Sequence, residues 1–306
     1  MKGVILAAGK GTRLYPVTHH IPKPILPLAN RPTIYYAFDR LKEVGIEDVC
    51  VVVGETEGAM RAALGDGSEF DLRLTYVRQT DPHGLAHAVG FAEGFVGGDD
   101  FVLYLGDAIY SEGFGAFAKR FKESGCANLN IVKAVEDPSR FGVANVEGER
   151  IVKLVEKPKV PESNLAMAGM YFFGPSIWKV LPDLKPSARG EYEITDAIQM
   201  LIDRGETVLA GVYEGVWFDT GTLDSFLETS RFLTGGKSMV GDATVEGKVA
   251  AAAVVGDGAQ VACTLISDSV ILPGARVMVQ GSIRHSVLGG NVAVNGDIEG
   301  QILFGE

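Results

Sequence analysis

The opening of the chain constrains the fold most, because an apolar segment ends directly in a glycine-containing loop. Residues 4–8 are aliphatic or small and suit a buried strand, and Gly9, Gly11 and Arg13 follow at once. Without a β-carbon, glycine lets backbone N–H groups approach phosphate oxygens closely, and a guanidinium adds a fork of donors for the same oxygens. The segment therefore predicts a strand followed by an anion-binding loop.

Two well-known phosphate-binding loops do not match this segment. A P-loop needs Ser or Thr after its lysine, but Gly11 follows Lys10, and Val4 stands where the first glycine belongs. The dinucleotide-binding fingerprint needs a third glycine where this chain has Leu14. A glycine pair after a strand is also common in plain tight turns, so the loop alone does not establish a binding site.

The N-terminal part of the chain alternates short apolar runs with amphipathic stretches. We expect strands over residues 4–8, 49–53, 72–77 and 101–105, and helices over 34–44 and 85–95. This alternation predicts βαβ units around a Rossmann-like mixed, mainly parallel sheet flanked by helices. Ligands of such sheets bind beyond the carboxyl ends of the strands.

The rest of the α/β body is expected to contain four further strands and two helices. The strands are 141–146, 151–155, 166–173 and 208–212, and the helices begin at 195 and 223. Gly235 and Gly236 then make a plausible boundary. We therefore expect an α/β domain over residues 1–236 and a separate domain over 237–306.

The C-terminal seventy residues are rich in Gly, Ala and Val. Aliphatic or aromatic residues recur there about every six positions, with two slips of phase, at Val249, Val255, Val261, Ile271, Val277, Ile283, Val292, Ile298 and Phe304. A period of six with small residues between is typical of a hexapeptide β-solenoid, which resembles a left-handed β-helix. An irregular glycine-rich β-meander is the alternative.

Composition narrows the class of protein. The 306 residues contain 28 Lys and Arg against 39 Asp and Glu, a formal charge of −11, which argues against a nucleic-acid partner but not against a phosphorylated ligand. The three cysteines form no C-x-x-C pair, so neither a zinc site nor a disulfide framework is expected. No signal peptide or membrane-spanning run is apparent, and we expect a cytoplasmic protein without membrane association.

A second motif identifies the glycine loop. Lys23 lies between Pro22 and Pro24, so it extends from a stiff segment. Gly-x-Gly-Thr-Arg-Leu followed by Pro-Lys-Pro resembles the signature of the sugar nucleotidylyltransferases, and glucose-1-phosphate thymidylyltransferases are the most similar branch. The resemblance continues through seven blocks, which contain residues 77–86, 105–107, 141–143, 155–158, 168–171, 188–196 and 217–222.

The resemblance implies a GT-A-like nucleotidyltransferase fold and a role for each matching residue. Arg13 and Lys23 would be catalytic, facing the triphosphate and the leaving pyrophosphate. The nucleotide would be bound by Leu6, Ala8, Gly9, Gly11, Thr12, Gln79, Gly84 and Asp107. The sugar phosphate would be bound by Gly142, Glu156, Lys157, Gly169, Tyr171 and Arg189. Asp107 and Asp219 would hold Mg²⁺.

These residue types suit the chemistry. When a sugar phosphate attacks the α-phosphorus of a nucleoside triphosphate, two anions meet and the nucleophile is already ionised. Cations and a metal are therefore needed more than an acid or a base. The amide of Gln79 offers a donor and an acceptor together, which suits the edge of thymine or uracil. His87 is expected on a helix surface facing the nucleotide.

Two departures from the family pattern keep the substrates open. Ala108 stands where the family commonly has an asparagine that helps to hold the sugar, and Ala7-Ala8-Gly9-Lys10 replaces Ala-Gly-Gly-Ser, as in uridylyl- and acetylglucosamine-directed relatives. The substrates are thus dTTP or UTP with glucose 1-phosphate, or another pair that gives GDP-mannose, ADP-glucose or UDP-acetylglucosamine. A sugar-nucleotide-binding regulatory protein is the non-catalytic alternative. The solenoid is too short for an acyltransferase and suits homo-oligomerisation or regulation.

Overall fold

The chain forms two compact units, each assembled from two segments of sequence. The structure is a computed structural model that describes residues 1–306. The first unit comprises Met1–Gly9 with Ala37–Trp217, and the second comprises Lys10–Tyr36 with Phe218–Glu306. This division differs from a single boundary after residue 236, because the segment after the first strand packs with the C-terminal part of the chain.

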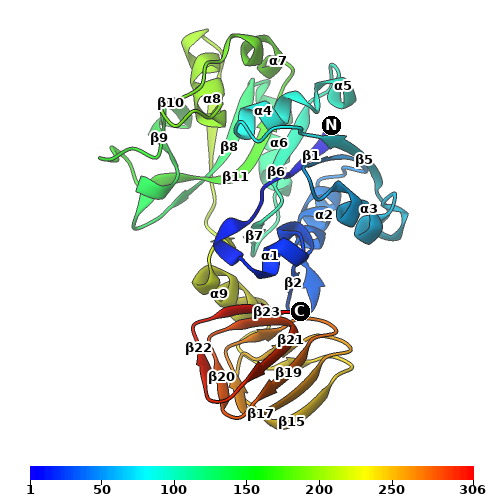
Figure 1. The fold of residues 1–306 in the computed structure, drawn as a ribbon. Coiled ribbons are helices and arrows are strands. Elements are labelled where there is room, and N and C mark those ends of the chain that lie inside the picture. The colour runs from blue at the N-terminus through cyan, green and yellow to red at the C-terminus, as the bar shows by residue number, and fades with distance from the viewer. The chain divides into compact units, whose positions relative to one another are not determined.

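The first unit is built on a nine-stranded mixed sheet with the order β5-β4-β1-β6-β11-β8-β12-β10-β9 (Figure 1). Its strands are β1 (Lys2–Ala7), β4 (Asp48–Val53), β5 (Arg73–Arg78), β6 (Phe101–Leu105), β8 (Asn128–Ala134), β9 (Gly142–Glu147), β10 (Arg150–Glu156), β11 (Leu165–Phe173) and β12 (Val208–Val212). Strands β5, β4, β1 and β6 are parallel. Strand β11 is antiparallel to β6 and β8, and β10 is antiparallel to β12 and β9.

This topology decides where three of the predicted site residues lie. Gly9 comes two positions after β1 ends, Gln79 directly after β5, and Asp107 two positions after β6. Because β5, β4, β1 and β6 are parallel neighbours, their carboxyl ends share one edge of the sheet. Ligands of open α/β sheets bind at that edge.

Nine α-helices accompany the strands. They are α1 (Val17–His20), α2 (Thr33–Glu43), α3 (Glu57–Leu64), α4 (Leu85–Gly90), α5 (Glu93–Val96), α6 (Gly115–Ser124), α7 (Ile177–Val180), α8 (Ile194–Asp203) and α9 (Leu223–Leu233). The single helix expected over 85–95 is wrong, because the chain forms α4 and α5 with a break between them. Gly90 and Gly94 weaken a continuous helix there.

Alternate residues of the central strand β11 pack on opposite faces of the sheet, as the two-residue period of a strand requires. Tyr171 and Phe173 belong to a core that contains Val89 of α4 and Ile198 of α8. Phe172 points the other way, and its ring lies 5.7 Å from that of Phe121 in α6. Burying an aromatic side chain of this kind contributes about 1.5–3 kcal/mol, so both helical layers are anchored to the same strand.

The C-terminal part of the second unit, drawn yellow to red in Figure 1, is a stack of parallel strands. Its strands are β14 (Met239–Val240), β15 (Thr244–Val249), β16 (Val254–Val255), β17 (Gln260–Ser267), β18 (Val270–Ile271), β19 (Arg276–Val279), β20 (Ser282–Arg284), β21 (Val287–Val294), β22 (Ile298–Glu299) and β23 (Ile302–Gly305). Two short two-stranded sheets complete the inventory. One consists of β2 (Pro27–Leu28) and β3 (Arg31–Pro32), and the other of β7 (Ala108–Tyr110) and β13 (Trp217–Asp219).

The stack repeats about every sixteen residues. Val240 pairs with Val255, Val255 with Ile271, and Ile271 with Leu288, so successive coils are offset by 15, 16 and 17 residues. Seven of the nine predicted period-six residues are buried: Val255, Val261, Ile271, Val277, Ile283, Val292 and Ile298. Ile266 and Leu288 complete the buried columns at positions outside that series. The columns therefore follow steps of four to six residues.

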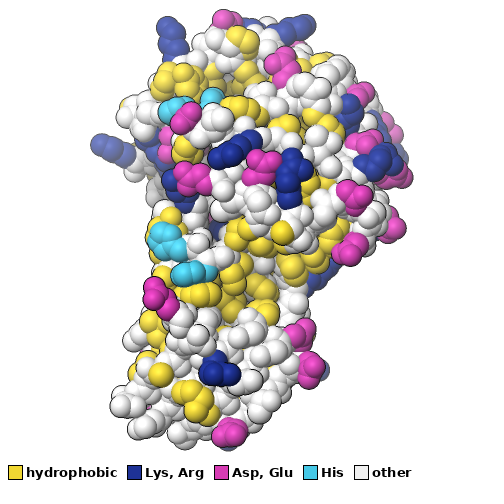
Figure 2. Space-filling view, turned by 45° about the vertical axis from the view of Figure 1, so that its right-hand side comes forward, with side chains coloured by type: hydrophobic (Ala, Val, Ile, Leu, Met, Phe, Trp, Pro, Cys, Tyr) yellow, Lys and Arg dark blue, Asp and Glu magenta, His cyan; other side chains and the backbone are white.

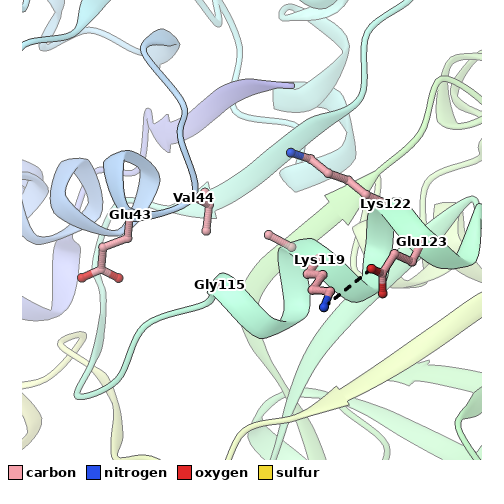
Figure 3. Close-up of a pocket in the computed structure, with 7 residues that line it drawn as sticks. Glu43, Val44, Gly115, Lys119, Lys122 and Glu123 are labelled. Carbon is pink, nitrogen blue, oxygen red and sulfur yellow. Dashed lines mark ion pairs between the residues drawn. The ribbon is translucent and has the colours of Figure 1, made fainter.

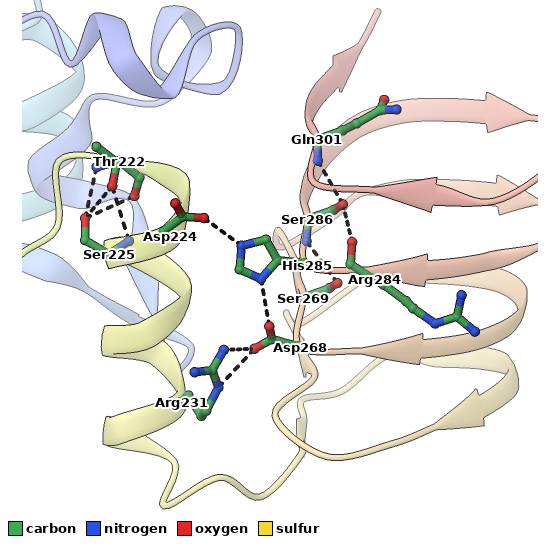
Figure 4. A network of polar contacts seen from close by, with 10 residues as sticks. All are labelled: Thr222, Asp224, Ser225, Arg231, Asp268, Ser269, Arg284, His285, Ser286 and Gln301. Carbon is green, nitrogen blue, oxygen red and sulfur yellow. Dashed lines mark hydrogen bonds and ion pairs between the residues drawn. The ribbon is translucent and has the colours of Figure 1, made fainter.

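Helix α9 is joined to the stack by a polar network (Figure 4). The imidazole of His285 lies between two carboxylates, 2.8 Å from Asp268 through Nδ1 and 2.8 Å from Asp224 of α9 through Nε2. Arg231, also on α9, donates to Asp268 over 2.6 Å. Asp268 and Asp224 together raise the pKa of His285, which favours the imidazolium form.

On the face drawn in Figure 2, Lys and Arg side chains alternate with Asp and Glu, and no extended patch of one sign is visible. Three valines and a methionine are among the large apolar side chains that remain exposed, at Val160, Val240, Val212 and Met278. No helix has the length and apolar character needed to cross a membrane.

Candidate active site

The glycine loop is folded against the predicted catalytic lysine. Gly11 has a φ of +64°, and a methyl group there would lie 3.2 Å from Cβ of Lys23 and 3.2 Å from Cγ2 of Thr18. The hydroxyl of Thr18 donates to the Gly11 carbonyl over 2.8 Å. Lys23 is only 8% exposed and begins a 3₁₀ turn directly after Pro22. The turn and the lysine thus pack closely, and a side chain at position 11 would be strained and would crowd Lys23.

Arg13 and Asp219 meet over a second glycine. A methyl group at Gly221 would lie 2.5 Å from Nη2 of Arg13 and 2.8 Å from Oδ1 of Asp219. The helix that follows is fixed by a capping box, in which the Thr222 hydroxyl accepts from the Ser225 backbone and the Ser225 hydroxyl from the Thr222 backbone. The predicted catalytic arginine and one predicted metal ligand therefore occupy one small region of the second unit.

The oxygen donors present are those that a magnesium ion uses. Asp107 follows β6 and Asp219 ends β13, and both side chains are partly exposed. No group of three or more His, Cys, Asp or Glu side chains forms a metal cage by itself. Mg²⁺ commonly keeps several waters and is bound by one or two carboxylates together with substrate phosphates. Each of these two aspartates offers donors of the kind that such a site uses.

The segment after β5 positions the amide of Gln79. This side chain is 6% exposed, and its backbone N–H donates to the Val53 carbonyl over 2.8 Å. Gly84 has φ +110° and ψ 173°. A β-carbon there would lie 2.6 Å from the carbonyl oxygen of Tyr192 and 2.7 Å from its nitrogen. Only glycine therefore fits at position 84, where the backbone lies beside the amide of Gln79.

Five charged or hydroxyl side chains gather where the sugar phosphate was predicted to bind. The guanidinium of Arg189 lies 3.4 Å from Glu156 and 3.3 Å from Glu193, and the ammonium of Lys157 lies 3.5 Å from Glu156. Thr195 donates to Glu156 over 3.2 Å. Burial raises the pKa of Glu193. Glu156 is thus held by two cations and a hydroxyl, and the cations remain partly exposed to a ligand.

The other residues predicted to bind the sugar phosphate are closely packed. A methyl group at Gly142 would lie 2.5 Å from Cγ2 of Thr195 and 3.2 Å from Oε2 of Glu156, so the backbone approaches the acidic cluster closely. Gly169 has a φ of +85° and packs against Leu105. Tyr171 is 3% exposed, and burial raises the pKa of its hydroxyl. Its ring belongs to the core of the sheet.

The predicted nucleotide-side residues at the end of β1 run from the interior to the surface. Leu6 is 9% exposed, Ala8 is half-buried, and Gly9 and Thr12 are exposed. This gradient is what a strand leading into a ligand loop requires, because the strand supplies packing and the loop supplies accessible N–H groups.

A family model for nucleotidyl transferases matches residues 2–236. The chain belongs to the nucleotidyl transferase family. Its relatives are sugar-1-phosphate nucleotidyltransferases, and it has nucleotidyltransferase activity. Enzymes of this family generally use a divalent metal.

Three proteins illustrate the similarity of this nucleotidyl transferase to others. A low-salt glycan biosynthesis nucleotidyltransferase of Haloferax volcanii is 44% identical over 81% of this chain and 72% of its own length. A glucose-1-phosphate thymidylyltransferase of Streptomyces antibioticus is 39% identical over 100% of this chain and 88% of its own. A solved structure of a Bacillus anthracis protein assigned as a glucose-1-phosphate thymidylyltransferase is 38% identical with a TM-score of 0.72, covering 76% of this chain and 94% of that chain.

Several contacts around the nucleotidyl transferase site were not predicted from the sequence. Thr18 and Gly221 pack on predicted catalytic or metal residues, Glu193 and Thr195 hold Arg189 and Glu156, and His87 contacts Gln79. Glu193 and Thr195 lie inside a motif block, so their position was a signal for them. His87 was expected on a helix surface facing the nucleotide, and it lies half-buried on α4, where its contact with Gln79 was not predicted.

A hollow of about 390 Å³ lies elsewhere in the first unit, between the end of α2 and helix α6 (Figure 3). Its charged lining comprises Glu43, Lys119, Lys122 and Glu123, and the ammonium of Lys119 lies 3.8 Å from Glu123. None of the predicted site residues lines it. The hollow is therefore separate from the residues that carry the nucleotidyl transferase motifs.

Proposed function

We propose that this enzyme condenses glucose 1-phosphate with dTTP, in a Mg²⁺-dependent reaction, to give dTDP-glucose and pyrophosphate. The observation that carries the proposal is the packing of Arg13 and Asp219 on Gly221, with Lys23 packed on Gly11 in the same unit. A phosphoryl-transfer site needs cations beside a metal-binding carboxylate, and a glycine loop beside them can donate N–H groups to phosphate.

In the proposed reaction, an oxygen of the sugar phosphate forms a bond to the α-phosphorus of the triphosphate. The bond from that phosphorus to the oxygen of the β-phosphate breaks, and pyrophosphate leaves with the bonding electrons. Arg13 and Lys23 stabilise the charge that grows on this leaving group. A Mg²⁺ ion held by Asp107 and Asp219 would neutralise phosphate charge when it is bound.

The sugar phosphate is proposed to bind at Lys157 and Arg189. Both cations contact Glu156 in the structure, with side chains about 42% and 41% exposed. An incoming phosphate can therefore compete for them, while Glu156 is left to accept hydrogen bonds from sugar hydroxyls. Gly142, Gly169 and Tyr171 are proposed to shape the same site, with the close backbone approach at Gly142 placed against the sugar ring.

The preference for thymine rests on the relatives that are named glucose-1-phosphate thymidylyltransferase. UTP is the alternative triphosphate, because Ala8-Gly9-Lys10 follows the uridylyl pattern and thymine differs from uracil only by a methyl group worth about 1 kcal/mol of burial. Leu6, Ala8, Gly9, Gly11 and Thr12 are proposed to line the nucleotide.

A matrix of substrates tests the proposal. Pyrophosphate release is measured with dTTP, UTP, CTP, ATP and GTP against glucose, mannose and N-acetylglucosamine 1-phosphates. We expect the highest kcat/KM for dTTP with glucose 1-phosphate. A higher value for UTP would establish the uridylyltransferase, and a higher value for another base or sugar would overturn both. Tight binding of a nucleotide sugar without turnover of any pair would identify a regulatory binding protein.

The C-terminal stack over 237–306 is proposed to be a β-solenoid of the hexapeptide kind that supports a homo-oligomer. The parallel columns with their aliphatic interior support the solenoid, and their 15- to 17-residue offsets indicate three sides of about five or six residues each. Sedimentation of the full chain tests the oligomer, because a monomer at micromolar concentration would exclude it.

A further inference from the structure

The amide of Gln79 has a partner that the proposed function does not use. Its Nε2 lies 3.0 Å from Nδ1 of His87 and 3.5 Å from the carbonyl oxygen of Gly84. Gln79 directly follows the edge strand β5 and is itself buried, so the two contacts are made away from bulk water. Hydrogen bonds in such surroundings restrict an amide more than they do on an open surface.

The two contacts decide which way the amide faces. The carbonyl oxygen of Gly84 can only accept, so the nitrogen end of the Gln79 amide must point toward it. The same nitrogen then donates its other hydrogen to Nδ1 of His87, which accepts when the ring carries its proton on Nε2. Both amide hydrogens are thereby directed to the protein, and Oε1 is the atom left to accept from a ligand.

His87 is held firmly enough to impose this orientation. Its ring lies between three aromatic neighbours, with centroids 5.2 Å from His83, 5.1 Å from Phe91 and 6.1 Å from Tyr192. Tyr192 in turn is tied to the start of α4, because its nitrogen donates to His83 over 2.7 Å and its carbonyl accepts from Ala86 over 3.0 Å. The imidazole therefore cannot swing away without disturbing α4.

We propose that His87 is a positioning residue for base selection, which fixes the Gln79 amide so that Oε1 accepts from the imino N3–H of a keto pyrimidine. The inference rests on the proposed function, in which Gln79 contacts the base. Cytosine has an acceptor at N3, so a fixed Oε1 would oppose it. An amide that could rotate would instead offer Nε2 to cytosine, and the discrimination would fall.

The matched pair of substrates is dUTP and dCTP, which share their sugar and phosphates and differ only at the base edge. If ribonucleotides prove to be the better substrates, UTP and CTP serve equally. The variants are His87→Phe, which keeps an aromatic ring but removes the acceptor, and His87→Asn, whose Oδ1 can replace Nδ1 as an acceptor. Gln79→Ala is measured alongside them.

We expect His87→Phe to lower the ratio of kcat/KM for dUTP over dCTP by about 10-fold, which corresponds to the loss of one net hydrogen bond. The change should come mainly from KM for the triphosphate, because neither residue touches the reacting phosphorus. His87→Asn should recover the wild-type ratio to within about threefold. Thermal melting of each variant shows whether α4 is still packed.

Three outcomes would overturn the inference. They are an unchanged ratio in His87→Phe, an equal loss in His87→Phe and His87→Asn, and no preference for dUTP over dCTP in the wild type. Gln79→Ala separates this failure from that of the proposed function. If Gln79→Ala abolishes base discrimination while His87→Phe does not, Gln79 contacts the base without help from His87. If Gln79→Ala has no effect on discrimination, the proposed base contact itself is wrong.

Discussion

Replacing Gly84 by alanine should damage both stability and nucleotide binding, and the structure gives the size of the effect. The residue has φ +110° and ψ 173°, a region open almost only to glycine, which costs other residues about 1–3 kcal/mol. The added carbon would also lie 2.6 Å from the carbonyl oxygen of Tyr192. Backbone hydrogen bonds to His83 and Ala86 hold that peptide in place, so overpacking adds about 1–3 kcal/mol.

We therefore expect Gly84→Ala to lower the free energy of unfolding by about 2–6 kcal/mol, less any part of the strain that movement of the loop relieves. Relief by movement would displace Gln79, so KM for the triphosphate should rise by about 10-fold or more. Urea unfolding measures the first quantity, and steady-state kinetics with saturating sugar phosphate measures the second.

Gly90→Ala is the matched control, because this glycine is the last residue of α4, the helix that Gly84 precedes, and an added carbon there meets no atom within 4 Å. Alanine at an open helical position is expected to be neutral or to stabilise by about 0.5–1 kcal/mol. If Gly84→Ala and Gly90→Ala unfold at the same urea concentration and bind triphosphate equally well, the backbone around Gly84 is not constrained as the geometry indicates.

Three further predictions concern the charged residues. Asparagine at Asp107 or Asp219 should lower kcat by about 100-fold or more with unchanged urea unfolding, and near-normal turnover of both variants with Mg²⁺ would disprove the metal assignment. Lys157→Ala should raise KM for the sugar phosphate more than for the triphosphate, whereas Arg13→Ala should lower kcat; the reverse pattern would mean that the two binding roles are exchanged. The two carboxylates beside His285 raise its pKa, so their stabilisation is present at low pH and is lost as the pH rises through that raised value. We expect the stability advantage of the wild type over His285→Asn to shrink as the pH rises from about 5 to 9. The change should be under about 1 kcal/mol, because these side chains are partly exposed. Melting curves at each pH measure it, and a pH-independent difference would exclude the linkage.

Continuous apolar runs predicted the parallel half of the sheet well. The expected strand 101–105 is β6, and 49–53 lies within β4. The same pattern does not predict the central strand β8, because Asn128 and Asn130 interrupt it with polar groups that are fully buried. In the folded chain Asn128 donates to the Phe172 carbonyl over 2.9 Å. That partner comes from a strand more than forty residues away, and local sequence cannot reveal it.

The site was predictable to the extent that a residue's chemistry is visible in its own motif. Arg13 and Lys23 stand out as cations beside glycine and proline, and the structure packs Lys23 on Gly11. What the motifs do not specify is how a side chain is oriented. The contact between Gln79 and His87 joins a strand end to a helix, and its meaning depends on which end of the amide faces the ring. Such a pairing follows from packing and not from spacing.

The segment that carries the two predicted catalytic cations packs with the C-terminal stack as well as with its own turn. His20, near the end of this segment, stacks on Phe304 of the last strand, with ring centroids 4.0 Å apart and planes 7° from parallel. Asn30 donates to the Val255 carbonyl over 3.0 Å. Within the loop itself, the hydroxyl of Thr18 still holds Gly11.

Removing the chain after residue 236 would delete both of these contacts with the stack, whereas the contacts within residues 10–36 and those between β2 and α9 would remain. The order of the glycine loop then depends on these remaining contacts, and a net hydrogen bond contributes about 0.5–1.5 kcal/mol. Closing and ordering several loop residues costs about 1–2 kcal/mol for each backbone unit that is fixed. The contacts from the stack therefore contribute free energy in the same range as the entropic cost of ordering that they offset. A domain boundary drawn at residue 236 divides residues that stabilise one another.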